Sequence, residues 1–238
     1  FLLFWLCIQT SSFLYAFKNI KGLKWFWPQV RAIKATLNEG KHIFLSHFFT
    51  RIYGFGSILI GGFLLSPLQL GIFAAASKLI NVAQSFLFQP LHGALFPFLS
   101  KKKNEILTAY KKGHQKSLLL LLLLCLAAAL FLMILSPWLI DLIFGKDYES
   151  SVRLLKIMAP MIIAGGCVHM FLQQGLLILR KDRIYMVIIV FTGISSIILN
   201  LILIKAYDVT GAAIVRLITE IIIALAAAIM FYKNINKA

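Results

Sequence analysis

The chain alternates long apolar stretches with short polar connections. Each stretch is close to the roughly 20 residues that cross a bilayer as a helix. The seven stretches cover residues 1–17, 42–65, 70–99, 117–144, 153–179, 184–204 and 211–232. This pattern predicts an all-α fold, a polytopic transmembrane helix bundle. The first stretch lacks a basic leader region and a small-residue cleavage site, so it is interpreted as the end of a preceding helix.

Basic residues in the connections predict the orientation of the bundle. Zero, one and one Lys or Arg fall in residues 66–69, 145–152 and 205–210. The other connections are much richer, with six, six, three and two in residues 18–41, 100–116, 180–183 and 233–238. Because cytoplasmic loops collect Lys and Arg, we expect this second group in the cytoplasm, the C-terminus included.

Composition argues against an ordinary soluble protein, a nucleic-acid-binding protein and a metal-binding protein. Hydrophobic residues make up 61% of the 238 and charged residues only 13%, against about half and a quarter in soluble domains. A net charge of +16 would suggest nucleic acid in a soluble protein, but here it is concentrated in the cytoplasmic connections, so no nucleic-acid partner is expected. Cys7, Cys125 and Cys167 lie in apolar stretches without metal-ligand spacing, and neither metal nor cofactor is predicted.

Two of the basic connections have amphipathic patterns. In residues 18–41, Val30, Ile33 and Leu37 recur on one helical face. A similar apolar face is formed in residues 100–116 by Ile106, Leu107 and Tyr110. Both patterns are typical of a helix on the membrane surface. The alternative, simple anchoring to the membrane by the basic residues, is sufficient for both segments.

Polar side chains inside the second and third stretches are the main functional candidates. Arg51 lies about 13 Å into its span, near the middle of a roughly 30 Å hydrocarbon core. A charge there costs about 2.5–3.5 kcal/mol, which makes it a functional candidate by default. It shares a helical face with His47. The next span carries a matching face formed by Lys78, Asn81, Ser85, Gln89 and His92.

These two faces predict facing walls of a water-filled cavity. The substrate-cavity candidates are Arg51, Lys78, His47, Asn81, Gln89 and His92. The alternative for the neutral side chains is hydrogen bonding between packed helices. Weaker polar faces occur in later spans, at Gly166, His169 and Gln173 and at Thr192, Ser196 and Asn200.

Arg216 and Glu220 lie one helical turn apart in the last span. They are interpreted as an ion pair or as a proton relay. Prolines 90 and 97 are expected to bend the third span, and Pro160 the fifth. The sequence has no HExxH, GxSxG or nucleotide-binding glycine loop, and its outward loops are short. We therefore expect a protein that is not an enzyme.

Two stretches resemble a known family. The run LGIFAAASKLINVAQSFLFQPLHGALFPFLS, from Leu70 to Ser100, resembles the second half of polysaccharide-biosynthesis flippases of the Wzx, or O-antigen transporter, type. The run SPWLIDLIFGKDYESSVRLLKIMAP resembles a further element of that family, through Gly145, Tyr148, Ser151 and Leu155. The resemblance covers residues 40–235 and places the chain in the C-terminal half of a MATE-like transporter.

The resemblance implies a domain division and a function. Residues 1–17 would end a preceding transmembrane helix, 18–41 would form a cytoplasmic amphipathic connection between lobes, and 42–238 would form a C-terminal lobe of six helices. The expected function is to flip an undecaprenyl-pyrophosphate-linked oligosaccharide across the bacterial inner membrane, by alternating access through a cationic cavity. Expected partners are this lipid, membrane lipids, H⁺ or Na⁺ as coupling ion, and a polysaccharide polymerase with its chain-length regulator. The alternatives are an ion-coupled multidrug exporter of the same superfamily and a membrane polysaccharide polymerase or ligase.

Overall fold

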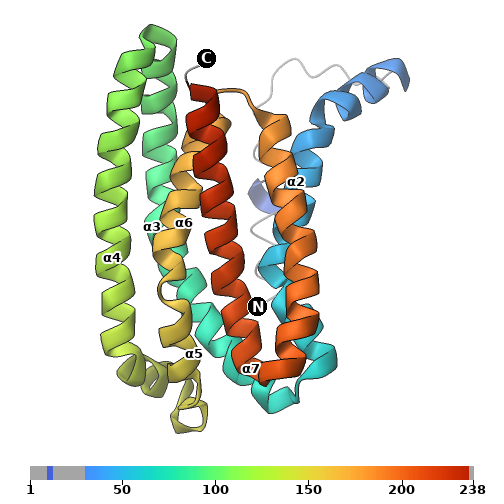
Figure 1. Cartoon of the computed structure of the whole chain (residues 1–238), viewed down its shortest axis with the longest axis vertical. Helices are drawn as coiled ribbons and strands as arrows, with labels where there is room; N and C mark the ends of the chain where they lie inside the picture. The colour runs from blue at the N-terminus through green and yellow to red at the C-terminus, as the bar shows by residue number, and fades with distance from the viewer. Residues whose placement is uncertain (1–9, 13–29, 236–238) are drawn as a thin grey trace. The chain divides into compact units, whose positions relative to one another are not determined.

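The computed structural model of the chain (Figure 1) describes residues 10–12 and 30–235, without the side chains of residues 30–43, His47 and Asn104. The predictions for residues 1–9 and 13–29 fall outside the described part. Two compact units divide the chain, Phe1–Gly40 and Lys41–Ala238. In the first unit, residues 10–12 and 30–40 are helical.

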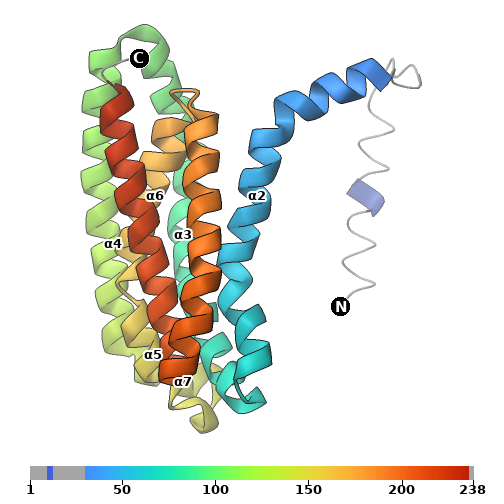
Figure 2. The ribbon, with the colours of Figure 1, turned by 45° about the vertical axis from the view of Figure 1, so that its right-hand side comes forward.

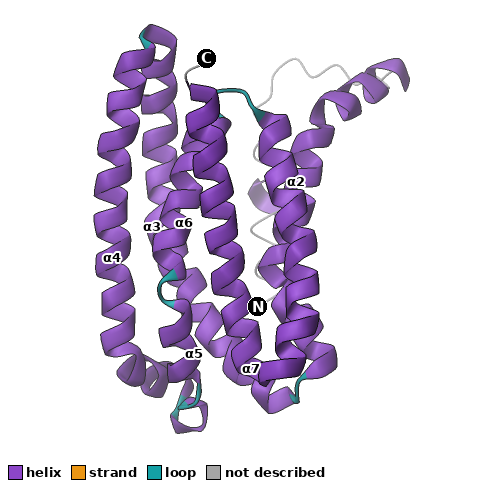
Figure 3. Cartoon of the chain, viewed as in Figure 1, coloured by secondary structure: helices purple, strands orange, loops and turns teal. Residues whose placement is uncertain are grey.

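The second unit is a bundle of long helices. In the described residues it contains helix and short turns, and Figure 3 shows no strand among them. The elements are α2 (Val30–Leu64), α3 (Pro67–Glu105), α4 (Leu107–Phe144), the 3₁₀ turn η1 (Lys146–Tyr148), α5 (Ser151–Met158), α6 (Met161–Val168), the π-helix η2 (His169–Leu176) and α7 (Asp182–Ile235). The all-α prediction is therefore confirmed.

The lengths and composition of these helices fit a membrane. Four helical segments are long and apolar enough to cross one: Pro67–Lys103, Leu107–Phe144, Ser151–Leu176 and Asp182–Ile235. The last contains two legs, because the backbone leaves helical geometry at Tyr207 and Asp208. The two legs lie side by side in Figures 1 and 2. The protein is thus a polytopic membrane helix bundle, and all six stretches predicted from residue 42 onwards are helical.

Local sequence explains where the helices begin and break. Ser66 caps α3: its hydroxyl accepts the backbone N–H of Gln69 at 3.3 Å, and the Gln69 side chain accepts the Ser66 N–H at 3.1 Å. Pro67 follows at the first helical position. Pro160 lies between α5 and α6, so the fifth span is interrupted at the position where the sequence predicts a bend.

The prediction of a surface helix over residues 100–116 is wrong. α3 and α4 both continue through this segment and meet at Ile106, so residues 107–116 are the first turns of α4. Tyr110 is 0% exposed and His114 is 2% exposed. Both pack inside the bundle because their polar atoms find hydrogen-bond acceptors there.

The turn after α4 packs against the start of α3 and is hydrogen-bonded to it. Gly145 has φ of 85°, a conformation that disfavours side chains. A Cβ built on Gly71 would lie 3.8 Å from the Tyr148 ring, and the Ser151 hydroxyl donates to the carbonyl of Ile72 at 2.9 Å. The two stretches that carry the family resemblance therefore contact each other.

Candidate substrate cavity

A polar cavity of about 390 Å³ lies within the bundle. Five elements supply its walls, and most of the lining side chains are aromatic or form hydrogen bonds. The lining residues are Tyr53 of α2, Gln84, Phe88, Gln89 and His92 of α3, Gly165 and Val168 of α6, His169 and Gln173 of η2, and Glu220 of α7. Such a volume lies within the roughly 300–1,000 Å³ of small-ligand pockets.

Gly165 makes room for the polar groups of the cavity. A Cβ at this position would lie 2.7 Å from Nε2 of Gln84, 3.2 Å from Oε1 of Glu220 and 3.2 Å from the Phe88 ring. Nε2 of Gln84 is buried and has no hydrogen-bond partner within the described residues. Because a buried unpaired amide is costly, this donor is available to a ligand in the cavity.

Two histidines meet at one side of the cavity. Gln174 Nε2 donates to Nδ1 of His92 at 3.1 Å and lies 3.5 Å from Nε2 of His169. The His169 ring stacks on Phe88, with ring centroids 5.4 Å apart and planes 15° apart. Since an amide nitrogen only donates, the facing imidazole nitrogens act as acceptors.

The histidine cluster is held by an irregular helix. η2 is a π-helix, a rare geometry that often occurs at functional sites. Two side chains of α4 bond to its backbone: Tyr110 donates its hydroxyl to the Gln174 carbonyl at 2.8 Å, and His114 Nε2 lies 3.1 Å from the Met170 carbonyl. These contacts fix the segment that carries His169 and Gln173.

Arg216 and Glu220 make different contacts. The Arg216 guanidinium donates to Oδ1 of Asn81 on α3 at 2.9 Å. Within residues 30–235, this is the hydrogen bond recorded for its side chain, and no bond to Glu220 accompanies it. Glu220 is 7% exposed and lines the cavity. The arginine thus ties α7 to α3, while the carboxyl group faces the cavity.

The sequence-predicted candidates fall into three groups. Gln89 and His92 line the cavity with Glu220. Asn81 is exposed and engaged by Arg216. Arg51 on α2 and Lys78 on α3 are exposed and lie outside the lining. His47 lies in α2, but its side chain is outside the described ones.

The α3 candidates form one uncovered face. Lys78, Asn81, Ser85, Gln89 and His92 recur at spacings of three and four residues and are all exposed. The weaker face at Thr192 and Asn200 instead bonds within its own helix, to the carbonyls of Ile188 and Ser196. The donors of Thr192 and Asn200 are thus satisfied within their own helix, although Oδ1 of Asn200 is buried without a partner among the described residues, whereas the α3 face presents its groups outward.

Five lining residues were absent from the sequence-based candidates: Tyr53, Gln84, Phe88, Gly165 and Val168. Tyr53 lies two residues after Arg51, off the polar face of α2. Gln84 lies three residues after Asn81, a spacing that could have indicated it. Phe88 carries no polar atom, so a search for polar faces does not select it.

Comparisons with known proteins agree on one family. The model of a family described as "Polysaccharide biosynthesis protein" matches residues 4–153. A protein of Escherichia coli (strain K12) is 27% identical over 211 residues, covering 86% of this chain and 49% of its own length. A protein of Shigella dysenteriae is 28% identical over 200 residues, covering 83% and 49%. Both are named "Putative O-antigen transporter".

The chain spans about half the length of these curated relatives. No solved structure matches it.

Proposed function

The chain belongs to the polysaccharide biosynthesis protein family, and on that premise we propose that it forms one lobe of a transporter for a lipid-linked oligosaccharide. The lipid is undecaprenyl pyrophosphate, and the membrane is the bacterial inner membrane with the C-terminus in the cytoplasm. The oligosaccharide crosses by alternating access between this lobe and a second one. The cargo serves O-antigen or other surface polysaccharide synthesis.

One observation carries the proposal: a cavity rich in hydrogen-bonding groups lies within a membrane bundle. A sugar presents many hydroxyl groups and needs donors and acceptors once it leaves water. Gln84 and Gln89 supply donors and acceptors, and Glu220 supplies acceptors. Tyr53 and Phe88 supply flat apolar surfaces for the faces of a sugar ring.

Arg51 and Lys78, which lie outside the cavity lining, supply positive charge for the pyrophosphate group. A pyrophosphate group loses hydration when it moves toward the bilayer interior, and nearby fixed cations offset that cost. Both side chains are exposed on the lobe, as a lumen between two lobes requires. The polyprenyl tail stays in lipid while the head group and sugar use the polar path.

The test uses the full-length protein in cells that depend on it. Arg51→Ala and Lys78→Ala should each abolish surface polysaccharide without lowering the amount of protein in the membrane. Lys205→Ala is the matched control, because Lys205 is an exposed lysine beside the break between the two legs of α7 and not within the spans of α2 and α3 that carry Arg51 and Lys78. Normal surface polysaccharide in both the Arg51 and Lys78 variants would refute the cationic path.

A second candidate is an ion-coupled multidrug exporter of the same superfamily. The observation favouring it is the charge of the cavity lining: the ten lining residues include the acidic Glu220 and no Lys or Arg. A buried carboxylate beside aromatic rings suits an organic cation. Export of a cationic dye that is lost in Glu220→Gln, with surface polysaccharide unchanged, would select this candidate. The same variant also tests whether Glu220 carries a coupling H⁺.

A further inference from the structure

A second, larger cavity lies where α4 ends and α5 begins. It has a volume of about 1250 Å³, and its walls come from the last two turns of α4, the η1 turn and α5. This exceeds the roughly 300–1,000 Å³ of pockets that hold drug-sized molecules. None of its lining residues belongs to the polar cavity described above.

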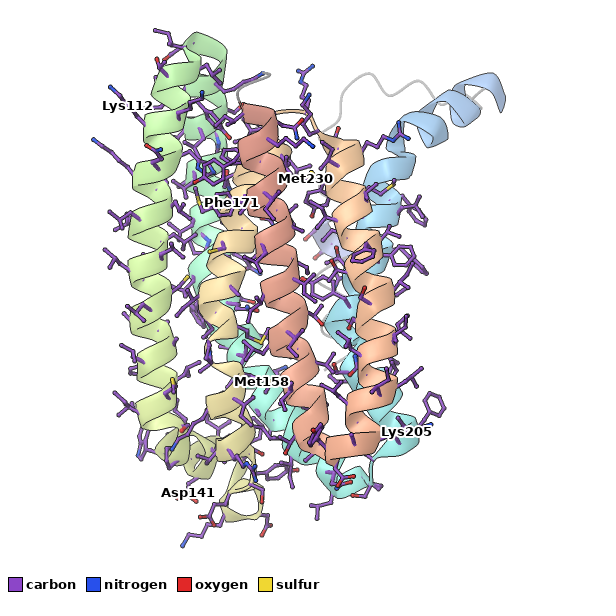
Figure 4. All side chains as sticks on the ribbon, viewed as in Figure 1. Lys112, Asp141, Met158, Phe171, Lys205 and Met230 are labelled. Carbon is purple, nitrogen blue, oxygen red and sulfur yellow. The ribbon has the colours of Figure 1, made fainter. Side chains whose placement is uncertain are left out.

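The depth of this cavity corresponds to lipid head groups. Lys116 is the last basic residue before the apolar part of α4, and Trp138 follows 22 residues later. At about 1.5 Å per residue this separation is about 33 Å, close to the thickness of a hydrocarbon core. Trp138 is 60% exposed, and tryptophan favours the membrane–water interface. In Figure 4, Asp141 lies at one end of the bundle and Lys112 at the other.

The cavity carries charges of both signs. Arg153 and Lys156 lie three residues apart on α5, and Lys146 lies in η1. Asp141 and Glu149 supply the carboxylates of the lining. All five side chains are exposed. Within the part of the chain that the structure describes, none of the five has a recorded side-chain ion pair or hydrogen bond.

We propose that this cavity binds the zwitterionic head group of phosphatidylethanolamine. Arg153 and Lys156 bind the phosphate, since charge-assisted hydrogen bonds to phosphate are strong. Asp141 and Glu149 accept hydrogen bonds from the primary ammonium group. The acyl chains run along the apolar surface at Trp138 and Ile157.

Charge complementarity selects this lipid over others. An anionic phosphatidylglycerol head group leaves both carboxylates without a partner and repels them. The quaternary ammonium of phosphatidylcholine has no N–H to donate to Asp141 or Glu149. The proposal depends on the membrane location of the bundle and not on the cargo of the transporter.

The test is lipid retention by the purified full-length protein. Delipidated protein is mixed with phosphatidylethanolamine, phosphatidylglycerol or phosphatidylcholine, and the bound lipid is counted by native mass spectrometry. Phosphatidylethanolamine should bind about tenfold more tightly than either of the others. The variants are Arg153→Gln with Lys156→Gln, and Asp141→Asn with Glu149→Gln; each pair should remove that preference.

Lys205→Gln is the matched control, because Lys205 is exposed at the same end of the bundle as Asp141 (Figure 4) and outside the cavity. It should leave the preference unchanged. Equal binding of the three lipids by the unmodified protein would overturn the proposal. So would a preference for phosphatidylethanolamine that survives loss of both carboxylates. If the variant that lacks both basic residues does not fold, the variant that lacks both carboxylates tests the proposal alone. Surface polysaccharide is assayed separately and reports on transport.

Discussion

The hydroxyl of Tyr110 should contribute measurably to the stability of the bundle. It is fully buried and donates to the carbonyl of Gln174 at 2.8 Å. Gln174 lies in the last turn of η2, where carbonyls lack donors from a continuing helix. Among the backbone hydrogen bonds recorded around the end of η2, none is accepted by this carbonyl. Tyr110 therefore acts as a side-chain cap for the π-helix.

Tyr110→Phe removes this donor and keeps the ring. Interhelical hydrogen bonds in membrane proteins average about 0.6 kcal/mol, but leaving a buried acceptor unpaired costs about 1–3 kcal/mol. The second figure applies here, because no other donor to the Gln174 carbonyl is recorded in the described residues. The ratio of folded to unfolded protein should fall about 5-fold to 150-fold.

The measurement is reversible unfolding of the purified protein in mixed micelles. Tyr207→Phe is the matched control, because Tyr207 is 62% exposed and has no recorded hydrogen bond in the described part. It should unfold as the unmodified protein does. If Tyr110→Phe and Tyr207→Phe unfold at the same detergent concentration, the hydroxyl does not cap η2 and this reasoning fails.

Three further predictions use the same unfolding assay. Ser151→Ala should cost about 1 kcal/mol by breaking its bond to Ile72, whereas the neighbouring Ser150→Ala should cost nothing, because Ser150 is exposed and makes no capping bond. Gly211→Ala should cost about 1–3 kcal/mol or more, because its Cβ would collide with the Leu203 carbonyl, while Gly93→Ala, which meets no atom within 4 Å, should be tolerated. In double-mutant cycles, Arg216 should couple to Asn81 by about 0.6–1.7 kcal/mol and more strongly than to Glu220; the reverse order would contradict this expectation and favour the ion-pair interpretation.

The helices could be predicted from the sequence because a bilayer leaves the backbone few choices. Every polar backbone group in hydrocarbon must be satisfied within the chain, so a long apolar stretch forms a helix. The first turns of α4 were not predictable in this way. Tyr110 lies beside Lys111 and Lys112, a pattern shared by surface helices and by helix ends that extend past the membrane. Its burial depends on an acceptor 64 residues away.

In the candidate site too, the sequence indicates features that repeat within one helix but not contacts between helices. Periodicity along α3 selected Gln89 and His92, and both line the cavity in the structure. Arg216 illustrates the opposite case, since the local spacing pointed to Glu220 one turn away, while the recorded hydrogen bond is with Asn81, 135 residues distant. Which helix faces which depends on tertiary packing, and no periodicity within one helix contains that information.

The two stretches that resemble the transporter family contain residues that packing explains and one, Lys78, that it does not explain. Gly71 lies beside the Tyr148 ring, and the Ser151 hydroxyl donates to the carbonyl of Ile72. These two contacts join the start of α3 to the turn after α4. Packing accounts for the neighbouring apolar residues Phe73, Ala75 and Ala76, which are buried at 0–3% exposure.

Lys78 follows these residues in α3 and is exposed. No contact within the described residues explains a lysine at this position, and an exposed cation inside a membrane span is costly. The start of the first stretch therefore has a structural role, because it contacts the turn between α4 and α5. Lys78 in the same stretch requires a partner outside this bundle. A negatively charged head group in the lumen is the partner that the proposed function supplies.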